Sequence, residues 1–427
     1  MKIEELYQLY LEFPSVQTDT RKLKQGDLFF ALKGEHFNGN EFARQAIDSG
    51  AAYAIIDEEK FSIPGKTFLV DNVLVSLQML AKHHRQQFKI PFLAITGSNG
   101  KTTTKELVHA VLSTTYKTYT TEGNLNNHIG VPLTILKIKA DAEMAVIEMG
   151  ANHQKEIASY CEYAMPDYGL ITNCGKAHLE GFGGEEGVRK GKGELFDYLR
   201  EHNGTAFIMS DYVYLQEMSR GIKEIFTYGS INGDVVGQVV KNDPFLEVSF
   251  SKGLNGAVQS QLVGAYNLPN ILAAAAVGKY FSVDESKIIE ALTQYSPSNS
   301  RSQLLVKGNN KIILDAYNAN PSSMKVAIEN FSRIEDDRPK ILLLGAMAEL
   351  GDQSLEEHKF LIEVIRKHQW QNVLLVGGDF LKIQHPFLKF KSPEEAGEWL
   401  SKNHIENSYL LIKGSRSFKM EKVLDYI

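Results

Sequence analysis

The stretch LAITGSNGKTTTKE, residues 93–106, constrains this chain more than any other part of its sequence. The apolar run that ends at Thr96 predicts a buried strand, the next four residues predict a tight turn, and Lys101 to about Thr115 predicts an amphipathic helix. Glycines let backbone N–H groups crowd around an anion at the positive end of a helix. The order of strand, glycine turn and helix therefore predicts a phosphate-binding loop.

Two side chains of this loop suit phosphate chemistry. Lys101 can reach the terminal phosphates of a nucleotide, and the Thr102 hydroxyl can ligate Mg²⁺. Gly97 lies three positions before Gly100, whereas the common nucleotide-binding loop places its glycines five positions apart. A glycine turn with an incidental lysine is the alternative, and the position of Gly-Lys-Thr between a strand and a helix argues against it.

Length and charge limit what such a phosphate site can serve. The chain has 427 residues, which at roughly 150 residues per domain suggests three domains. It is 43% hydrophobic and 23% charged, with a net charge of −6. Because a mildly acidic chain attracts nucleic acid poorly, we expect a small-molecule phosphate ligand and no nucleic-acid partner.

We expect a cytosolic protein without a membrane span. The N-terminus MKIEELYQLY carries acids and tyrosines rather than a basic, apolar signal, and no segment has the roughly 18 to 20 continuous apolar residues that a span needs. Cys161 and Cys174 lack CxxC spacing, so we expect buried free thiols rather than a disulfide or a zinc site.

Residues 1–88 predict a small α/β domain. Strand-like runs at 27–32 and 52–56 flank a helical segment at 40–49. The polar stretches TDTRKLKQGD and KGEHFNGN fall on loops at strand ends, where such domains bind ligands, although ordinary solvated loops are an open alternative. A helical run followed by Lys-Ile-Pro predicts the domain boundary.

A second domain, residues 89–296, is predicted to carry the phosphate loop and further polar residues at strand ends. The apolar run AEMAVIEMG ends in Glu148, which is either a solvated rim residue or a magnesium ligand beside the phosphate loop. Another apolar strand leads into NCGKAHLEGFGG and places His178 at the same end of the sheet. VRKGKGELF starts a helix in which Lys190 and Lys192 lie close to glycines, and solvated and functional roles are equally open for them.

The remainder of this domain turns strand-rich between Thr205 and Val263 and then predicts an alanine-rich helix. Asn267 and Asn270 stand at the start of that helix, where they can cap it or contact a base edge. Three more asparagines supply amide groups in the stretch TTEGNLNNHIGVPLTIL: Asn124, Asn126 and Asn127.

Pro297 and the serines around it break the pattern near 295–299 and predict the start of a third domain, residues 297–427. Strands and helices alternate in this domain: strands at 311–315, 340–344, 372–376 and 409–412, and helices at 322–334 and 355–368. This alternation predicts a Rossmann-like parallel sheet with helices on both faces. Its loops carry the polar runs DAYNANP, GAMAELG and KGSRSFKME.

Taken together, these motifs resemble those of the Mur ligases, which join amino acids to the peptide stem of bacterial cell-wall precursors. TGSNGKTTTKE resembles their ATP loop, and this accounts for the short glycine spacing. GNLNNHIGVPLTIL, EMGANHQKEI, NCGKAHLEGFG, AYNANP and KGSRSFKMEKV resemble the branch that adds D-alanyl-D-alanine, and TDTR, GDLFFALKGE and GNEFARQAIDSGA resemble the uridine-binding domain of that branch and its nearest relative. The resemblance covers nearly the whole chain. It implies three α/β domains: a small N-terminal uridine-binding domain, a central P-loop ATPase-type domain and a C-terminal Rossmann-like domain.

The resemblance also implies a catalytic and a nucleotide-binding set. The catalytic residues are Lys101, Glu148, His178 and Lys192. The ATP phosphates are expected on Gly97, Ser98, Asn99, Gly100, Lys101, Thr102 and Thr103, with the adenine on Asn270, a phosphate on Arg301 and the ribose on Asp315.

Two magnesium sites and a set of substrate contacts follow from the same resemblance. Thr102 and Glu148 are expected to hold one Mg²⁺, and His178 with a carbamylated Lys192 the second, because a carbamate replaces a repelling ammonium with an oxygen ligand. The substrate contacts implied are Thr20, Arg21, Lys33, Asn126, Asn127, Asn318, Lys413 and Arg416.

Two positions depart from the family pattern. Leu314 replaces the first of two acids that commonly precede Tyr-Asn-Ala-Asn-Pro, which leaves Asp315 alone for the ribose. Gly191 stands before Lys192, where alanine is usual. Neither departure removes a residue to which the resemblance assigns chemistry.

The reaction implied is ATP-driven amide formation in the bacterial cytoplasm by a monomeric chain, with Mg²⁺ as cofactor. The substrates would be UDP-N-acetylmuramoyl-tripeptide, whose carboxylate attacks the γ-phosphate of ATP, and D-alanyl-D-alanine, whose amine then attacks the acyl phosphate. Closure of the C-terminal domain is expected to assemble the site. Three alternatives stay open: the ligase that adds the third stem residue, a folylpolyglutamate-type ligase, and a nucleotide-dependent binding protein without ligase activity.

Overall fold

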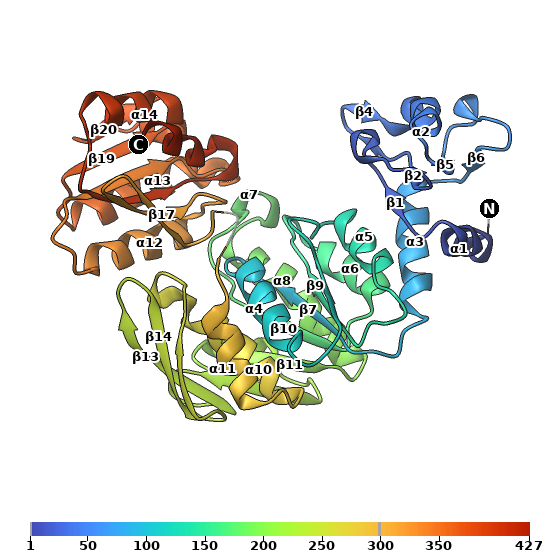
Figure 1. The fold of residues 1–427 in the computed structure, drawn as a ribbon, viewed down its shortest axis with the longest axis horizontal. Helices are drawn as coiled ribbons and strands as arrows, with labels where there is room; N and C mark the ends of the chain where they lie inside the picture. Colours follow the sequence, from blue (N-terminus) through green and yellow to red (C-terminus); the bar gives the residue numbers. More distant parts are fainter. Residues whose placement is uncertain (1, 298–299) are drawn as a thin grey trace.

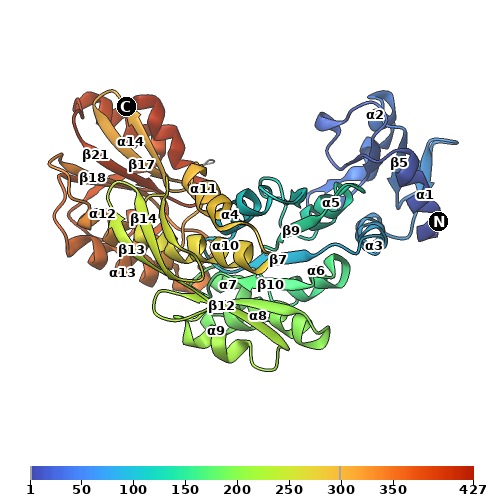
Figure 2. The same cartoon turned by 60° about the horizontal axis from the view of Figure 1, so that its bottom comes forward.

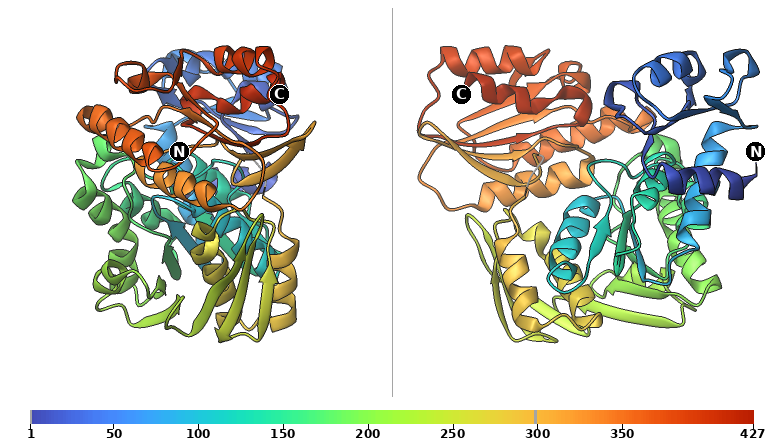
Figure 3. Two further views of the ribbon diagram at one scale, coloured as in Figure 1. Left: turned by 90° about the vertical axis from the view of Figure 1, so that its left-hand side faces the viewer. Right: turned by 45° about the vertical axis from the view of Figure 1, so that its right-hand side comes forward.

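Three sheets organise the chain in the computed structural model, which describes residues 2–297 and 300–427. The N-terminal domain (blue) and the C-terminal domain (orange to red) stand above the central domain on opposite sides (Figure 1). The two views in Figure 3 show the same arrangement from other directions. The boundary predicted near 295–299 falls partly outside the described residues, so the predicted domain limits at 88/89 and 296/297 stay predictions.

The N-terminal domain contains a four-stranded parallel sheet in the order β1-β2-β5-β6. Its elements are α1 (Ile3–Glu12), β1 (Val16–Gln17), β2 (Leu28–Phe30), β3 (Lys33–Gly34), β4 (Phe37–Asn38), α2 (Ala43–Asp48), β5 (Tyr53–Ile56), β6 (Thr67–Leu69) and α3 (Val73–Arg85). Helix α3 packs against α1 and also against the central domain, where Arg85 donates to the carbonyls of Ala164 and Met165. The last helix of the predicted N-terminal domain therefore joins two domains (Figure 1).

The central domain contains a nine-stranded sheet in the order β15-β14-β13-β12-β11-β10-β7-β9-β8. Its strands are β7 (Phe92–Thr96), β8 (Thr118–Thr120), β9 (Met144–Glu148), β10 (Tyr168–Ile171), β11 (Thr205–Met209), β12 (Glu224–Gly229), β13 (Val235–Asn242), β14 (Leu246–Lys252) and β15 (Gly256–Gln259). Its helices are α4 (Lys101–Leu112), α5 (Gly130–Leu136), α6 (Glu156–Ala164), α7 (Leu179–Phe182), α8 (Glu185–Glu201), α9 (Val213–Met218), α10 (Leu268–Tyr280) and α11 (Glu285–Gln294). The strands from β8 to β13 in this order pair in parallel, and β13, β14 and β15 pair in antiparallel fashion.

The order of the parallel strands explains where this domain binds a ligand. From β7 the chain runs to β8 and β9 on one side, and then to β10 and β11 on the other side. In such sheets the crevice opens at the carboxyl ends of the strands where the direction reverses. The carboxyl ends of β7, β9 and β10 therefore meet at one place, near which Lys101 begins α4, Glu148 ends β9 and His178 precedes α7.

The C-terminal domain contains a six-stranded sheet in the order β16-β17-β21-β18-β19-β20. Its elements are β16 (Gln303–Lys307), β17 (Asn310–Asp315), α12 (Pro321–Arg333), β18 (Lys340–Gly345), α13 (Ser354–Arg366), β19 (Asn372–Val376), β20 (Leu388–Phe390), α14 (Pro393–Lys402) and β21 (Tyr409–Lys413). The prediction of a wholly parallel sheet was wrong at one edge, because β16 pairs with β17 in antiparallel fashion. A short hairpin around Gly308 makes this pairing possible, and β16 was not predicted.

Apolar side chains alternate between the two faces of this C-terminal sheet. Ile313, Leu342 and Leu411 join the large core that includes residues of α12 and α13, whereas Ile312 and Leu410 join a second core with residues of α14. Neighbouring residues of a strand point to opposite faces, so a sheet covered on both sides needs apolar residues throughout. The view in Figure 2 shows the C-terminal sheet with its helices beside the central domain.

Three details differ from the sequence-based expectation or complete it. Helix α8 begins at Glu185, so VRKGKGELF lies inside the helix rather than at its start. Cys161 and Cys174 are both free thiols as expected, but only Cys161 is buried, and Cys174 is half-buried. Among residues 2–297 and 300–427, none of the helices has the length and apolar character that a membrane crossing requires.

Candidate active site

A cleft of about 970 Å³ lies between the central and C-terminal domains. It is lined by residues from the loops after β7, β9 and β10 and from the loops after β17, β18 and β21. Most of the predicted site residues line it: Ser98, Asn99, Gly100, Lys101, Thr102, Thr103, Asn126, Asn127, Glu148, His178, Asn270, Arg301, Asp315, Asn318, Lys413 and Arg416. Gly97, Lys192, Thr20, Arg21 and Lys33 are not among the lining residues.

Backbone geometry explains the glycines of the phosphate loop. Gly97 and Gly100 have φ angles of 140° and 81°, which L side chains rarely adopt. A Cβ atom on Gly97 would lie 2.0 Å from Oγ1 of Thr172, and one on Gly100 would lie 2.6 Å from Oδ1 of Asn270. The loop therefore packs too closely against its neighbours for any side chain at these two positions.

Lys101 is the first residue of α4 and folds back over its own loop. Its Nζ donates to the carbonyls of Gly97 (2.6 Å) and Ser98 (3.3 Å). Burial lowers the pKa of its ammonium group, the charge of Glu148 opposes this shift, and the charge of Arg301 adds to it. The cation is thus held at the mouth of the loop, where an anionic ligand would lie.

Glu148 ends β9 and is fully buried beside the phosphate loop. Its Oε1 accepts from the Thr102 hydroxyl (3.1 Å) and from Nδ2 of Asn126 (2.7 Å). Its Oε2 has no hydrogen-bond partner among the described residues. Since Glu148 faces the phosphate loop and not the solvent, the rim-residue alternative is excluded.

The chemistry of this group of residues fits a magnesium ion. A buried carboxylate oxygen without a partner is costly, and a cation beside it would remove that cost. Mg²⁺ prefers oxygen ligands and is commonly held by one or two carboxylates together with phosphate oxygens and water. Among residues 2–297 and 300–427, no group of three or more His, Cys, Asp and Glu side chains is placed to hold a metal ion. Glu148 and Thr102 would therefore need oxygens from the nucleotide and from water.

His178 meets a residue of the C-terminal domain. Its backbone has a φ angle of +52°, and its Nδ1 lies 2.5 Å from Oε2 of Glu349, whose own φ is +61°. The hydrogen bond with His178 lowers the pKa of the Glu349 carboxyl. Non-glycine residues in this left-handed region are uncommon and often occur at functional sites. The contact between His178 and Glu349 thus joins two unusual backbone positions across the domain interface.

The structure separates the two lysines of α8. Lys190 is exposed and pairs with Glu186 one turn away at 2.8 Å, which makes it a solvated lysine. Lys192 is fully buried, donates to the carbonyl of Ala151 (3.0 Å) and lies 4.8 Å from the centre of the Phe182 ring. Burial, followed by the nearby charge of Lys101, lowers the pKa of Lys192 to about 7. The metal role of Lys192 with His178 stays a prediction, because the two side chains have different partners here.

Phe182 also explains one departure from the family pattern. A Cβ atom on Gly191 would lie 2.4 Å from Cε1 of Phe182. Alanine at this position would require the ring to move, so glycine lets Phe182 pack over Lys192.

Several asparagines line the central side of the cleft and are held there by hydrogen bonds. Oδ1 of Asn127 accepts from the backbone of Ile129 and Gly130 and so caps the start of α5. Asn270 is held from both sides, since its Oδ1 accepts from Thr104 (3.0 Å) and its Nδ2 donates to Oδ1 of Asn267 (2.9 Å). Asn267 occupies the N-cap position of α10, but its side chain makes no capping hydrogen bond, and Asn270 lies inside the helix. The capping alternative is therefore wrong, and contact with a base edge stays a prediction.

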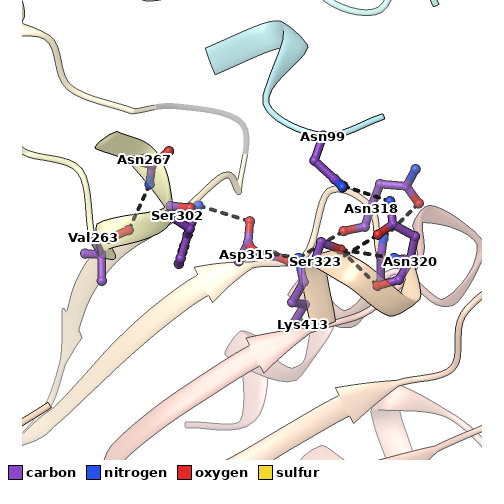
Figure 4. A network of polar contacts seen from close by, with 11 residues as sticks. Asn99, Val263, Asn267, Ser302, Asp315, Asn318, Asn320, Ser323 and Lys413 are labelled. Carbon is purple, nitrogen blue, oxygen red and sulfur yellow. Dashed lines mark hydrogen bonds and ion pairs between the residues drawn. The ribbon is translucent and has the colours of Figure 1, made fainter. Parts of the chain in front are cut away.

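The C-terminal side of the cleft is built around Asp315 (Figure 4). Asp315 and Lys413 are neighbours on β17 and β21, and Nζ of Lys413 lies 2.5 Å from Oδ2 of Asp315. Lys413 also donates to the carbonyl of Asn318 (3.2 Å). Leu314 points away from the cleft into the C-terminal core. Asp315, the next residue, is an acid and faces the cleft.

Two arginines lie at one tyrosine in the same wall. The guanidinium of Arg301 stacks 3.7 Å from the centre of the Tyr317 ring, and that of Arg416 lies 5.6 Å from the same ring. Nε of Arg301 is buried without a partner among the described residues, whereas Arg416 pairs with Glu421 (3.0 Å). These cations give the cleft wall a positive edge that suits phosphate or carboxylate groups.

The predicted contacts of the N-terminal domain lie apart from the cleft. Arg21 is exposed and pairs with Asp19 (2.8 Å) just after Thr20 begins a short helical turn. Lys33 bridges Asp57 (2.9 Å) and Glu58 (3.0 Å), and its hydrogen bond with Asp57 is the main cause that raises its pKa. The structure does not bring these residues to the phosphate loop, so they could contact only a distant part of a long substrate.

Several site residues were missed by sequence reasoning. Asn173 exchanges two hydrogen bonds with the backbone of Asn99, and Tyr317 and Glu349 line the cleft. The runs NCGKAHLEGFGG, DAYNANP and GAMAELG that carry them are among the strand-end loops that the sequence predicts. The partners of Asn173 and Glu349 lie more than 70 positions away along the chain, and the sequence gives no signal for such pairings.

Comparison with known proteins places this geometry in a family. Residues 12–86 match the model described as "Mur ligase family, catalytic domain", residues 95–278 the "Mur ligase middle domain", and residues 300–416 the "Mur ligase, glutamate ligase domain". A protein of Bacillus subtilis named UDP-N-acetylmuramoyl-tripeptide–D-alanyl-D-alanine ligase is 34% identical over 96% of this chain and 92% of its own length. The chain belongs to the Mur ligase family.

Solved structures of Mur ligases are similar to this chain over nearly its whole length. MurF from Acinetobacter baumannii has a TM-score of 0.87 and 29% identity, over 98% of this chain and 97% of its own. MurF from Thermotoga maritima in complex with ADP has a TM-score of 0.85 and 28% identity, over 97% of both chains. The three-domain Mur ligase fold predicted from the sequence is thus confirmed.

Proposed function

We propose that this chain is an ATP-dependent ligase that adds D-alanyl-D-alanine to UDP-N-acetylmuramoyl-tripeptide in peptidoglycan precursor synthesis. The observation that carries the proposal is the cleft itself, in which the phosphate loop and Glu148 face the C-terminal loops DAYNANP and KGSRSFKME. A relative that carries this activity in its name aligns over 96% of the chain, which adds independent support.

The reaction has two steps. The terminal carboxylate of the tripeptide attacks the γ-phosphate of ATP, which gives an acyl phosphate and ADP. The amine of D-alanyl-D-alanine then attacks the acyl carbon, the C–O bond to phosphate breaks, and inorganic phosphate leaves with loss of a proton from the amine. The first step brings the carboxylate anion to the anionic γ-phosphate, and the second brings the amine to the acyl phosphate. The protein's main contributions are therefore to position the substrates and to neutralise their charge.

Residues of the phosphate loop supply much of this neutralisation. Backbone N–H groups at the start of α4 bind the phosphates, and Lys101 neutralises the charge of the terminal phosphate. Glu148 and Thr102 would hold Mg²⁺, which when bound supplies further positive charge at the phosphate oxygens. Asn126 fixes the Glu148 carboxylate by donating to Oε1, so Oε2 remains free to act as a ligand.

In this proposal Lys192 works as a carbamate. A neutral lysine amine adds to carbon dioxide with release of one proton, and the product is a carboxylate-like oxygen donor. Complete burial and a pKa of about 7 support the neutral amine that this addition requires. The alternative is an unmodified lysine that stays bonded to the carbonyl of Ala151, as it is here.

Other residues of the chain bind the remaining parts of the substrates. The nucleotide base and ribose lie near Asn270 and Asp315, and Arg301 contacts a phosphate. Asn126 and Asn127 contact the muramoyl peptide, while Asn318, Lys413 and Arg416 face the incoming dipeptide. The uridine end reaches Thr20, Arg21 and Lys33 on the N-terminal domain. All these groups belong to one chain, so a monomer suffices, and the reaction belongs in the bacterial cytoplasm, where ATP is available.

A phosphate-release assay tests the proposal. Purified protein is incubated with ATP, Mg²⁺, UDP-N-acetylmuramoyl-tripeptide and D-alanyl-D-alanine, and each component is left out in turn. We expect phosphate only when all are present. Release that continues without the dipeptide, or no release from the complete mixture, would contradict the assignment.

A further inference from the structure

A hydrogen bond joins the phosphate loop directly to the C-terminal domain. Nδ2 of Asn320 donates to Oδ1 of Asn99 at 2.8 Å (Figure 4). Asn99 lies in the phosphate loop, and Asn320 lies 221 positions later, immediately before α12. Asn320 is itself 9% exposed, so this contact is shielded from solvent.

The orientation of the Asn320 amide is fixed by a second role. Its Oδ1 accepts from the backbone N–H of Ser323 (2.9 Å) and so caps the N-terminus of α12. The backbone N–H of Asn320 in turn donates to Oγ of Ser323 (3.1 Å), which completes a capping box. Because the oxygen is occupied by the cap, the NH₂ group is the part that faces Asn99.

On its other side Asn99 is held by the central domain. Its backbone N–H donates to Oδ1 of Asn173 (3.1 Å), and its carbonyl accepts from the Thr172 hydroxyl (2.6 Å) and from Nδ2 of Asn173 (3.0 Å). The central domain therefore fixes the backbone of Asn99, and the C-terminal domain fixes its side chain. Without Asn320, the side-chain amide of Asn99 would lose its hydrogen bond to the C-terminal domain.

We propose that Asn320 is a positioning residue that ties the phosphate loop to the C-terminal domain, so that nucleotide binding and docking of that domain reinforce each other. In this role Asn320 acts through Asn99. A loop whose side chain is held in place loses less freedom when it binds phosphate, and this raises the affinity for the nucleotide. By thermodynamic reciprocity, a bound nucleotide favours the docked C-terminal domain by the same factor.

This inference rests on the proposed function, because it takes the cleft to be an ATP site. Its test measures nucleotide binding and does not require ligation. The measurement is the calorimetric Kd of a non-hydrolysable ATP analogue with Mg²⁺. The first variant is Asn320→Ser, because serine caps a helix about as well as asparagine but is too short to reach Asn99. We expect its Kd to be about tenfold weaker than that of the wild type, the size of one lost net hydrogen bond.

Asn330→Ala is the matched control. Asn330 lies on the same helix and also contacts the central domain, since its Oδ1 accepts from Nδ2 of Asn242 (2.8 Å) and from the backbone of Ala265 (3.3 Å). Its contacts do not include the phosphate loop. If Asn320 acts by aligning that loop, Asn330→Ala should leave the analogue Kd within about twofold of the wild type. An equal loss in both variants would mean that general domain docking is responsible, and the proposal would be wrong.

Two further measurements separate positioning from stability. Asn320→Ser should keep the thermal midpoint of the wild type because it keeps the cap, whereas Asn320→Ala should lower it. In a double-mutant cycle, Asn99→Ala combined with Asn320→Ser should bind the analogue no more weakly than Asn99→Ala alone, because the second change removes a contact already lost. Additive losses, or a wild-type Kd in Asn320→Ser, would overturn the proposal.

A ligation assay on the wild type distinguishes the two levels of inference. If the wild type ligates and Asn320→Ser shows the weaker analogue Kd, KM for ATP should rise about tenfold while KM for D-alanyl-D-alanine stays within about twofold. If the wild type does not ligate, the proposed function fails, and the calorimetric comparison still decides the role of Asn320.

Discussion

The cleft has two walls that are held in place in different ways. The central wall comprises the phosphate loop and Glu148, with the buried Lys192 behind it, and all of these residues lie within one domain. The C-terminal wall comprises the loops after β17, β18 and β21. Polar pairs that join these loops to the central domain include Asn320–Asn99 and Glu349–His178, and Glu357 of α13 adds a pair with Lys176. The central wall is therefore built within a single domain, whereas the position of the C-terminal wall depends on how the domains meet.

The two walls therefore have different roles: one carries the charged groups for the reaction, and the other aligns the second substrate. Groups that must carry charge at the reacting phosphate belong to the central wall, because electrostatic stabilisation is strongest when the groups are already in place. Groups that recognise the second substrate can belong to the wall that arrives with domain closure. Substitutions in the central wall should accordingly abolish activity, and those in the C-terminal wall should reduce it by degrees.

The largest effect is expected for Lys101→Ala. Removing this cation leaves the phosphoryl transfer without a main source of charge neutralisation, so ligation should fall by at least about 10³-fold. The thermal midpoint, measured in parallel, should stay close to that of the wild type because the hydrogen bonds of the side chain go to carbonyls of its own loop. Turnover equal to that of the wild type would remove the phosphate loop from the mechanism.

The next effect is expected for Lys192→Ala, with Lys190→Ala as the matched control on the same helix. Loss of an oxygen ligand should reduce ligation by about 10²-fold, whereas the exposed Lys190 should tolerate the change. Short carboxylic acids should partly restore the Lys192 variant, and ¹³C-labelled bicarbonate should give a carbamate signal in the wild type. Neither rescue nor signal would leave Lys192 as an ordinary buried lysine.

A smaller effect is expected for Glu349→Ala in the C-terminal wall. This change removes the partner of His178 and one of the links between the walls, so turnover should fall about tenfold. Glu356→Ala is the control, because Glu356 is exposed and pairs with Lys359 on its own helix. If both variants behave alike, the contact between Glu349 and His178 does not align the cleft.

The smallest effect is expected for Arg21→Ala in the N-terminal domain, away from both walls. Loss of one exposed cation near the uridine end should raise KM for the UDP-linked substrate about fivefold and leave KM for ATP unchanged. Its neighbour Lys22, changed to alanine, is the control. A rise in KM for ATP would show that the N-terminal domain affects the cleft after all.

The central wall was the more predictable of the two from sequence. Its phosphate loop is a local motif, because Thr96, Gly97, Gly100 and Lys101 are close in the chain and their types dictate strand, turn and helix. Glu148 could be placed because an apolar strand ends at it. The alternation of strands and helices likewise predicted most of the C-terminal sheet.

The pairs between the walls could not be predicted. Asn320–Asn99 and Glu349–His178 depend on how two domains dock, and the residue types involved also serve as caps and surface charges. The antiparallel strand β16 was missed for a related reason, since a short run such as QLLVK at a sheet edge has no distinct period. The buried state of Lys192 also required the structure, because its place on the inner side of α8 depends on the packing of Phe182.

The mass of the product decides whether this chain adds D-alanyl-D-alanine. The wild type is incubated with ATP, Mg²⁺, D-alanyl-D-alanine and UDP-N-acetylmuramoyl-tripeptides whose third residue is either lysine or diaminopimelate, and the products are identified by mass spectrometry. The account predicts a product equal in mass to one tripeptide plus one dipeptide minus one water, together with ADP and phosphate. A product that carries a single amino acid instead, or unchanged substrates beside a protein that binds ATP, would contradict it.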